Sequence, residues 1–311
     1  MAVPFEVIQE SLIGGRKSNQ DRVGYAFAND SLLMVVADGM GGHQNGEIAA
    51  EIAVRVLIER FNREARLALS NPSHFLRVAL EAAHAAIGSY TRTHKLPDFP
   101  RTTCIACVVQ HKIAYWCHAG DSRLYLLRKG RLYKRTRDHS RVQRLIDAGL
   151  IREDQALTHP ERNKVYSCLG GDQMPTISLS EGTRLNAGDI LLLCSDGFWG
   201  MLTSADIESG FSEEPFKISL PKLIQKSLAV AGGHGDNLSV VGVEWPGVVE
   251  KLEYIDSAVT MPADFLTRPV AAPPGKENLA AASVNTRTQS FPRPLVGGVN
   301  VWMPQLSCSL N

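Results

Sequence analysis

Two apolar segments of this sequence run directly into Asp-Gly pairs. Residues 32–37 lead into Asp38-Gly39, and residues 190–195 lead into Asp196-Gly197. Short apolar runs rich in Leu and Val are typical of buried strands, which bring their last residue to the rim of the core. An unpaired carboxylate is costly there. The pattern therefore requires a strand-built core whose edge supplies a counter-charge to both aspartates.

Three more aspartates stand at the ends of predicted strands. Asp121 follows the run 115–120, while Asp21 and Asp236 each precede a strand. Five carboxylates that converge repel one another and ionise together only beside a counter-charge. Because no His or Cys shares the set, Mg²⁺ or Mn²⁺ suits it best. Asp-Gly is also a common turn sequence, so the metal hypothesis rests on the five positions together.

Hydrophobic periodicity predicts an α+β fold. Two long helices are expected, over residues 46–63 and 73–93. Short turns at Asn29-Asp30, His111-Lys112 and Lys129-Gly130 separate neighbouring strands and indicate antiparallel hairpins. Helices followed by a run of such strands favour helices packed on antiparallel sheets. The expected strands cover residues 23–27, 32–37, 104–110, 113–118, 124–128, 190–194 and 238–243.

The overall charge excludes several classes of protein. The chain has 33 Lys and Arg against 32 Asp and Glu, a formal charge of +1. Nucleic-acid binders and membrane-surface proteins would show a basic excess. No apolar run approaches the ~20 residues of a membrane span, and residues 1–10 lack the basic and apolar blocks of a secretory signal. We therefore expect a cytoplasmic protein with no membrane span and no nucleic-acid partner.

Six cysteines lie mostly inside apolar runs. Without a secretory signal, free buried thiols in a reducing compartment are the favoured interpretation. Cys104 and Cys107 form a CxxC, but it lies in a predicted strand and has no second CxxC or paired His to complete a metal site. A metal or redox role for this pair is therefore disfavoured.

Two segments interrupt the strand pattern. Residues 137–169 contain a predicted short helix near 140–148, and the nine basic and five acidic residues within 131–164 give a local charge of +4. This segment is expected to cover one end of the sheets, as a solvated surface or as a substrate-facing one. Residues 247–311 hold 7 of the 16 prolines and no apolar periodicity, which predicts a largely disordered tail. The predicted domain is therefore 1–246.

Arg16 adds a candidate phosphate-binding group. It precedes Asn19-Gln20-Asp21, so a guanidinium and a candidate metal ligand share one short segment. The planar guanidinium suits phosphate because it donates two parallel charge-assisted hydrogen bonds. Gly39, Gly41 and Gly42 allow backbone to approach a ligand closely, but their spacing is not GxGxxG. This favours phosphate bound beside a metal over a direct nucleotide cradle.

The order of these motifs resembles the type 2C metal-dependent serine/threonine protein phosphatases, in particular their bacterial branch. The likeness covers about residues 7–245 in the family's order and spacing. Its motifs are Arg16-x-x-Asn19-Gln20-Asp21, Asp38-Gly39-Met40-Gly41-Gly42-His43, Gly120-Asp121-Ser122-Arg123, Leu169-Gly170-Gly171, Ser195-Asp196-Gly197 and Gly235-Asp236-Asn237.

The resemblance implies a fold as well as a site. It implies a four-layer αββα sandwich, in which two central antiparallel sheets are flanked by antiparallel helix pairs and the metal site lies at one end. It identifies residues 137–169 as the family's variable flap. Within that flap, Asp138-His139-Ser140 and His159-Pro160-x-Arg162-Asn163 match bacterial members.

Roles for the acidic residues follow from the same resemblance. By position, Asp38 would bridge two Mn²⁺ or Mg²⁺ ions, with the Gly39 carbonyl on one of them. Asp21 would serve one metal, and Asp196 and Asp236 would complete the other. The resemblance therefore implies a dinuclear centre built from strand ends.

The resemblance also implies a third metal ion, and the sequence differs from the family pattern at two positions. Asp121, together with Asp196, matches the third-metal site of bacterial members, and Arg16 matches the arginine that binds the substrate phosphate. Gln20 stands where many eukaryotic members have an acid. Met40 replaces a His proposed as general acid and cannot donate a proton; His43 lies nearby but is not assigned that role.

The implied activity is hydrolysis of phosphoserine and phosphothreonine in proteins by a metal-activated water. Since no Cys lies in a Cys-x5-Arg loop, a covalent intermediate is not expected. Two alternatives are a metal-dependent phosphohydrolase of a small metabolite and a catalytically silent phosphoprotein-binding module. The family implies phosphoproteins and a cognate serine/threonine kinase as partners, and a monomer is expected. The tail is either a docking segment or an unselected extension.

Overall fold

The computed structural model describes residues 7–28, 31–40, 45–65 and 68–246. All of these belong to one compact unit. The predicted tail lies outside the described residues, as do Gly41, Gly42, His43 and Cys308. The boundary at residue 246 and the expected disorder beyond it therefore stay predictions. No helix in the described ranges is long and apolar enough to cross a membrane.

Two antiparallel sheets lie at the centre of the described unit. The five-stranded sheet consists, in spatial order, of β1 (Val7–Leu12), β13 (Leu238–Glu244), β12 (Ile190–Cys194), β7 (Arg123–Arg128) and β8 (Arg131–Arg135). The six-stranded sheet runs β10 (Ser178–Leu179), β6 (Ile113–Ala119), β5 (Cys104–Gln110), β3 (Ser31–Ala37) and β2 (Arg22–Ala28), with β11 (Thr183–Arg184) also paired to β6. A separate two-stranded ladder joins β4 (Arg101–Thr102) to β9 (Leu169–Gly170).

The hairpins predicted from short turns are confirmed. Strands β5 and β6 pair antiparallel, and β7 pairs with β8 in the same way. The turn residues His111 and Lys112 have φ of 51° and 63°, and Lys129 and Gly130 have φ of 52° and 71°. Two consecutive left-handed residues give the tight turn whose twist matches the flanking strands. Strands β2 and β3 also pair antiparallel, although Asn29-Asp30 lies outside the described ranges.

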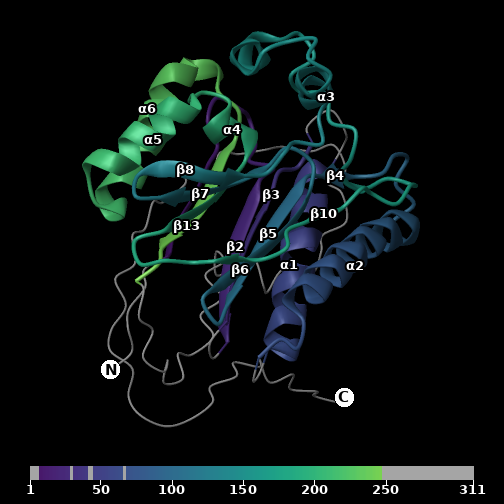
Figure 1. Cartoon of the computed structure of the whole chain (residues 1–311). Helices are drawn as coiled ribbons and strands as arrows, with labels where there is room; N and C mark the ends of the chain where they lie inside the picture. Colours follow the sequence, from purple (N-terminus) through teal and green to yellow (C-terminus); the bar gives the residue numbers. More distant parts are fainter. Residues whose placement is uncertain (1–6, 29–30, 41–44, 66–67, 247–311) are drawn as a thin grey trace, which may run out of the picture. The chain divides into compact units, whose positions relative to one another are not determined.

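Helices cover both outer faces of the sheets, as Figure 1 shows. Helices α1 (Gly46–Glu64) and α2 (Pro72–Thr93) share a hydrophobic cluster with the six-stranded sheet. On the five-stranded sheet, α5 (Ser204–Glu213) and α6 (Phe216–Ala231) pack together with the short α4 (Asp196–Trp199). A third cluster fills the space between the two sheets. The predicted four-layer αββα sandwich is therefore confirmed.

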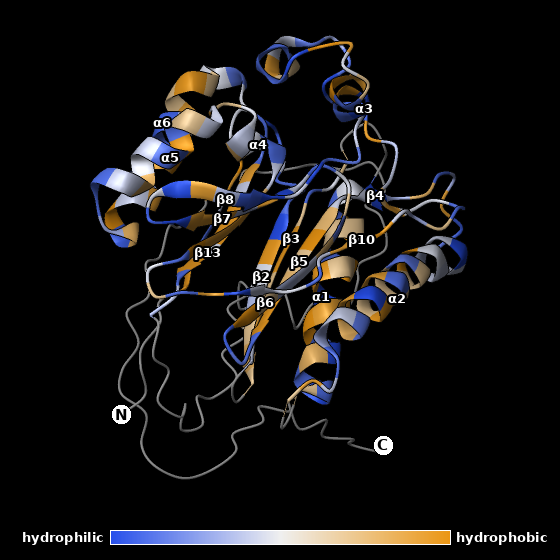
Figure 2. Cartoon of the chain, in the orientation of Figure 1, coloured by the Kyte–Doolittle hydropathy of each residue, from blue (hydrophilic) through white to orange (hydrophobic). Residues whose placement is uncertain are grey.

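Burial on both faces explains the continuous apolar runs in the sequence. Along β3, Leu33 and Val35 face the helix layer, whereas Leu32, Met34 and Val36 face the other sheet. Because successive side chains of a strand point to opposite faces, a strand between two layers must be apolar at every position. Figure 2 shows hydrophobic residues along these central strands. The residue that ends such a strand reaches the edge of two cores at once.

The first two predicted helices are confirmed to within a residue at each end. The α2 helix begins at Pro72, and the Asn71 side chain accepts a hydrogen bond from the His74 backbone N–H at 3.0 Å. An Asn N-cap followed by Pro at the first helical position favours this start.

Periodicity alone predicted the two helices of the first outer layer, whereas the family resemblance implied a second helix pair, which the structure contains. Helices α5 and α6, of 10 and 16 residues, follow β12 and complete the second outer layer. Sequence signals oppose both helices, because Pro221 lies inside α6 and Gly210 lies inside α5. A Cβ on Gly210 would come within 2.7 Å of the Leu223 side chain. The glycine therefore serves close packing of α5 on α6.

The flap, residues 137–169, follows β8 of the five-stranded sheet and ends at β9 of the two-stranded ladder. It contains α3 (Arg141–Asp147), close to the helix predicted near 140–148, and the 3₁₀ helix η1 (Glu153–Thr158). A β-bridge between Ser140 and Val165 closes its base. Leu157 packs against the core of the five-stranded sheet, and Glu153 forms an ion pair of 2.6 Å with Arg135 of β8. The flap is thus attached to the sheet at its base and along η1.

The CxxC pair does not form a joint ligand set. Cys104 lies in the cluster under α1 and α2, whereas Cys107 lies in the cluster between the sheets. Two residues on opposite faces of one strand cannot bind one ion. Burial raises the pKa of the Cys104 thiol to about 12, so it stays protonated and unreactive.

Candidate active site

The fold gathers four of the predicted acidic residues at one cavity of about 610 Å³. Asp38 follows β3, Asp121 follows β6, Asp196 opens α4 after β12, and Asp236 precedes β13. All four strands have a neighbouring strand on each side in their sheets, and their ends meet at this cavity. Arg16 and Gly39 line the same cavity.

Asp38 is a strongly perturbed group at this cavity. Burial raises its pKa well above the ordinary value, and the carboxylates of Asp21, Asp196, Asp121 and Asp236 raise it further. Its backbone is fixed, because the Asp38 carbonyl accepts hydrogen bonds of 2.9 Å from the Thr103 N–H and the Thr102 hydroxyl. A carboxyl held among four others retains its proton unless a cation compensates the charge.

Asp196 and Asp121 share this electrostatic environment. Burial and the charge of Asp236 raise the pKa of Asp196 to about 6, while a hydrogen bond between the Asp196 and Asp38 side chains lowers it. Burial and the charge of Asp196 raise the pKa of Asp121 well above its ordinary value. The three carboxyls therefore titrate together rather than independently.

Asp21 lies behind this group rather than at the cavity wall. It is 2% exposed, and its carboxylate accepts a hydrogen bond of 2.7 Å from the Ser195 hydroxyl. Burial raises its pKa to about 7, against the lowering effect of Ser195. The lining residues of the cavity include its neighbour Gln20 but not Asp21. Direct metal contact by Asp21 stays a prediction, and in this structure it acts on Asp38 through its charge.

Gly39 lies where three backbone segments cross. A Cβ at this position would be 2.5 Å from the Gln20 carbonyl oxygen and 2.6 Å from backbone atoms of Gly46. Gly39 also forms a β-bridge with Thr102. Only glycine fits this crossing, which brings the strand end carrying Asp38 against the start of α1.

These residues suit a hard divalent cation. The donors at the cavity are carboxylates and backbone oxygen, without His or Cys, which is the set that Mg²⁺ and Mn²⁺ prefer. The raised pKa values of Asp38, Asp121 and Asp196 are the signature of negative charge that lacks compensation. In the described part of the chain, no three His, Cys, Asp or Glu side chains already stand as a ligand cluster. The Asp236 carboxylate is engaged by Arg16 instead.

Arg16 lies at the mouth of the cavity on the loop between β1 and β2. Its guanidinium is 2.5 Å from the Asp236 carboxylate, and its side chain is 55% exposed. The loop is held by Asn237, whose side-chain amide donates to the Ile13 and Ser18 carbonyls at 2.8 and 2.9 Å. The Gly15 N–H also donates to the Gly235 carbonyl at 2.9 Å. Arg16 is therefore a positioned yet accessible cation beside the acidic cluster.

The two departures from the family pattern both line the cavity. Gln20 donates from its side-chain amide to the Glu47 carboxylate at 3.0 Å, and Met40 presents a thioether. Glu47 belongs to the first turn of α1. Sequence reasoning missed Glu47, since nothing local links it to Gln20.

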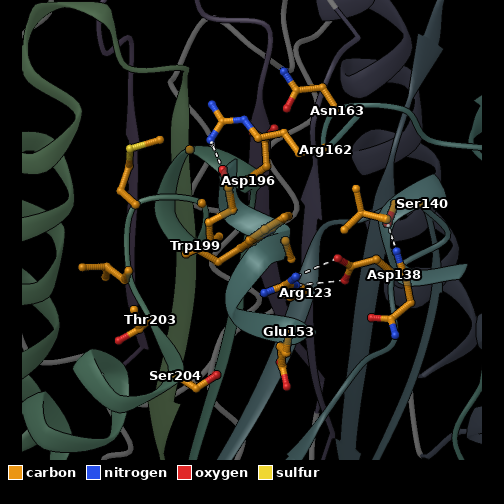
Figure 3. A pocket seen from close by; sticks show the side chains of 18 of the residues that line it. Arg123, Asp138, Ser140, Glu153, Arg162, Asn163, Asp196, Trp199, Thr203 and Ser204 are labelled. Atoms are coloured by element: carbon orange, nitrogen blue, oxygen red, sulfur yellow. Dashed lines mark hydrogen bonds and ion pairs between the residues drawn. The ribbon is translucent and has the colours of Figure 1, made fainter. Parts of the chain in front are cut away.

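The base of the flap is joined to the same site. Arg123, two residues after Asp121, makes a bidentate ion pair with Asp138 at 2.9 and 2.7 Å, seen in Figure 3. Its guanidinium lies 3.5 Å from the centre of the Trp199 ring, and the Trp199 indole N–H donates to the Asp121 carbonyl at 3.0 Å. The His139 N–H donates to the Gly120 carbonyl at 2.9 Å. The flap and the Asp121 loop are therefore fixed to each other.

The sequence motifs contain Ser195 and Asn237 but gave them no role, and Trp199 lies outside the motifs. Ser195, Asn237 and Trp199 make the contacts that hold Asp21, the Arg16 loop and Asp121. Ser195 and Asn237 are direct neighbours of predicted aspartates, but their partners lie 174 and 224 residues away in the sequence. Proximity to a motif was the only signal available for them.

Comparison with known proteins identifies the family of this chain. The family model described as protein phosphatase 2C matches residues 8–231. The serine/threonine protein phosphatase PstP of Mycobacterium tuberculosis is 32% identical over 292 residues, which cover 89% of this chain and 54% of PstP. The serine/threonine phosphatase stp of Listeria welshimeri is 30% identical over 233 residues, covering 74% of this chain and 91% of that protein.

Solved structures agree with this placement. The structure of the serine/threonine phosphatase Stp1 from Staphylococcus aureus superposes with a TM-score of 0.72 at 28% identity, covering 79% of this chain and 97% of Stp1. The catalytic domain of PstP in complex with two manganese ions gives a TM-score of 0.64 at 28% identity, with 77% of this chain and 97% of that domain covered. The residues matched by the family model include Arg16, Asp21, Asp38, Asp121 and Asp196. This chain belongs to the protein phosphatase 2C family.

Proposed function

We propose that this chain is a metal-dependent phosphatase that hydrolyses phosphoserine and phosphothreonine in proteins. The observation that carries the proposal is the convergence of Asp38, Asp121, Asp196 and Asp236 on one cavity that has Arg16 at its mouth. Membership of the protein phosphatase 2C family supports this proposal for the cavity. The match to PstP spans 54% of the length of that protein.

Mn²⁺ or Mg²⁺ is the cofactor that the donor set supports. Asp38, the Gly39 carbonyl, Asp196 and Asp236 would hold two ions, and Asp121 with Asp196 would hold a third. The manganese ions in the PstP catalytic domain support the choice of metal. Bound ions of this kind lower the pKa of water and polarise a phosphoryl oxygen. Asp21, behind Asp38, would add to the negative charge that holds them.

The residues of the chain itself would bind and orient the phosphate. Arg16 would exchange the Asp236 carboxylate for the substrate phosphate, because either anion can present two oxygen atoms to the planar guanidinium. Met40, at the cavity wall, cannot donate a proton to the leaving alkoxide. None of the five cysteines in the described ranges lines the cavity, so no cysteinyl-phosphate is proposed.

The proposed partners follow from the activity. Phosphorylated proteins are the substrates, and a serine/threonine kinase that produces them is the opposing enzyme. Relatives named serine/threonine phosphatases support this choice of substrate. We also propose a monomeric, cytoplasmic enzyme, as the buried free thiols of Cys104, Cys117 and Cys194 suit a reducing compartment.

The test compares substrates at fixed Mn²⁺. The full chain is assayed on a phosphothreonine peptide, on para-nitrophenyl phosphate and on a panel of phosphorylated metabolites. The proposal expects the highest kcat/KM on the peptide. A higher kcat/KM on one metabolite would replace it with a small-molecule phosphohydrolase. Hydrolysis of no substrate, together with metal-independent binding of the phosphopeptide, would replace it with a binding module.

A further inference from the structure

A second cavity, here called the flap groove, adjoins the active-site cavity. Its volume is about 420 Å³, and it lies between the flap and the segment that follows β12 (Figure 3). The two cavities share Arg16, Asn163, Asp196 and Asp236 as lining residues. A chain segment whose phosphate lies at Arg16 therefore has a continuous path into the groove.

Apolar side chains line both walls of the flap groove. The flap contributes Val142 and Ile146 of α3 together with Leu157 of η1. The opposite wall contains Met201 and Leu202, which follow α4. Val142 and Leu202 are buried, whereas Ile146, Leu157 and Met201 are partly exposed. The apolar lining is thus open to an entering side chain.

Most charged residues that line the groove form ion pairs, among them Arg16 with Asp236, whereas Arg162 donates a hydrogen bond of 3.0 Å to the Leu157 carbonyl. Arg123 pairs with Asp138 on the Trp199 ring, and Glu153 pairs with Arg135. Asp154 pairs with Arg152, which leaves no acidic lining residue of the flap without a cation. A charged side chain entering this groove would compete with formed pairs. An apolar side chain would bury hydrophobic area without such competition.

We propose that the flap groove binds an apolar side chain of the phosphoprotein, a few residues from the phosphorylated Ser or Thr. The inference rests on the proposed phosphatase function and specifies its substrate. An extended peptide advances about 3.3 Å per residue, so a side chain within a few positions of the phosphate reaches the adjoining groove. Ile146 and Met201, on opposite walls, are specificity-determining residues.

The experiment scans peptides against paired variants of the full chain. Leu or Ser is placed at each of the positions around a fixed phosphothreonine, and kcat/KM is measured with Mn²⁺. At one position, the peptide with Leu should have a kcat/KM roughly tenfold higher than the peptide with Ser, because loss of an apolar contact usually lowers kcat/KM by about that factor. Met201→Gln and Ile146→Asn should each reduce this preference to below about threefold. Met201→Leu and Ile146→Val, the matched controls, should retain it, and all variants should hydrolyse para-nitrophenyl phosphate equally.

Each other outcome overturns the proposal. Phosphopeptide hydrolysis without a preferred position, or a preference that survives both polar variants, rejects the groove but keeps the phosphatase. Absence of phosphopeptide hydrolysis rejects both. If deleting residues 247–311 raises kcat/KM equally for the Leu and Ser peptides and no preference exists, the groove binds this chain's own tail instead.

Discussion

Arg16 is paired with an aspartate in this structure because the cavity beside it carries excess negative charge. The same exposed guanidinium is the group best placed to bind a phosphate. Loss of a hydrogen bond to a charged group costs about 1.5–3 kcal/mol. Arg16→Ala should therefore lower kcat/KM on a phosphothreonine peptide by roughly ten- to a hundredfold. Lys17→Ala removes a neighbouring charge as a control, and an equal loss in both variants would contradict a specific role for Arg16.

The raised pKa of Asp21 should make the free energy of unfolding depend on pH. Its folded pKa is raised from 3.8 to about 7, so the folded state holds this proton more tightly than the unfolded state between those values. The stability that protonated Asp21 gives the folded state is therefore lost as the pH rises through that range. The free energy of unfolding falls by up to about 1.4 kcal/mol per pH unit. In EDTA, Asp21→Asn should be stabilised relative to wild type more at pH 7.5 than at pH 5.

The comparison between variants matters because other groups titrate in the opposite direction. Burial lowers the pKa of His139 to about 4, which favours the folded state as the pH rises. That effect is common to wild type and Asp21→Asn and cancels in their difference. Urea unfolding at the two pH values gives this difference, and a variant that gains no stability at pH 7.5 would contradict the assignment.

At the scale of residues, local patterns could be read and distant partners could not. The five aspartates were predicted because each ends or begins an apolar run. Ser195 and Glu47 were not, since the hydrogen bond from Ser195 to Asp21 spans 174 residues and that from Gln20 to Glu47 spans 27. Whether Asp21 contacts a metal could not be predicted either, because the sequence does not show whether a strand-end residue lines the cavity or is buried behind its lining.

At the scale of elements, the joint between the flap and the five-stranded sheet is electrostatic. The Arg123 and Asp138 side chains are only 11% and 6% exposed. Removing one partner leaves a buried charge, at a cost of about 3–5 kcal/mol. Arg123→Met should therefore lower the free energy of unfolding by about that amount, measured by urea denaturation. The double variant Arg123→Met with Asp138→Leu should recover most of it.

A surface pair provides the control for this prediction. Arg152→Met breaks the ion pair with Asp154, which is fully exposed, and should leave stability unchanged within error. Equal destabilisation by Arg123→Met and Arg152→Met would show that burial of the pair has no energetic role.

Element prediction succeeded where one physical signal dominated. The buried strands are continuous apolar runs, and α1 and α2 have clear helical periodicity. The ends of these elements differ from the predicted ones by at most about a residue. Helices α5 and α6 were missed because Gly210 and Pro221 oppose helix locally, while packing of the two helices on each other outweighs them. Two-residue strands such as β10 carry no periodicity at all and arise from the pairing partner.

At the scale of the whole molecule, the core defines where the domain can end. Trp245 is 5% exposed in the cluster between the sheets, and its backbone N–H donates to the Asp189 carbonyl at 2.7 Å. Truncation after Pro246 should leave the melting temperature and phosphopeptide turnover unchanged. Truncation after Glu244 removes the buried Trp and should cost about 3–5 kcal/mol. Loss of stability in the longer truncation product would show that residues 247–311 contribute to the fold.

The layered architecture was predictable only through the family resemblance. Continuous apolar strands indicate burial on both faces, but they do not say whether helices or a second sheet supply each covering layer. The motif order supplied that information and implied the helix pairs on both sides. The flap groove was not predictable, because it forms between residues 142–157 and 199–205, which are remote in the sequence.

In the proposed function, Asp38 would organise the metal centre. The direct measurement is Mn²⁺-dependent dephosphorylation of a phosphothreonine peptide by wild type, by Asp38→Asn and by the exposed control Asp172→Asn, across a Mn²⁺ titration. We expect the kcat of Asp38→Asn to be at least roughly a hundredfold below that of wild type at every Mn²⁺ concentration, and the kcat of Asp172→Asn to equal that of wild type. Near-wild-type turnover by a folded Asp38→Asn variant at saturating Mn²⁺ would contradict this role of Asp38.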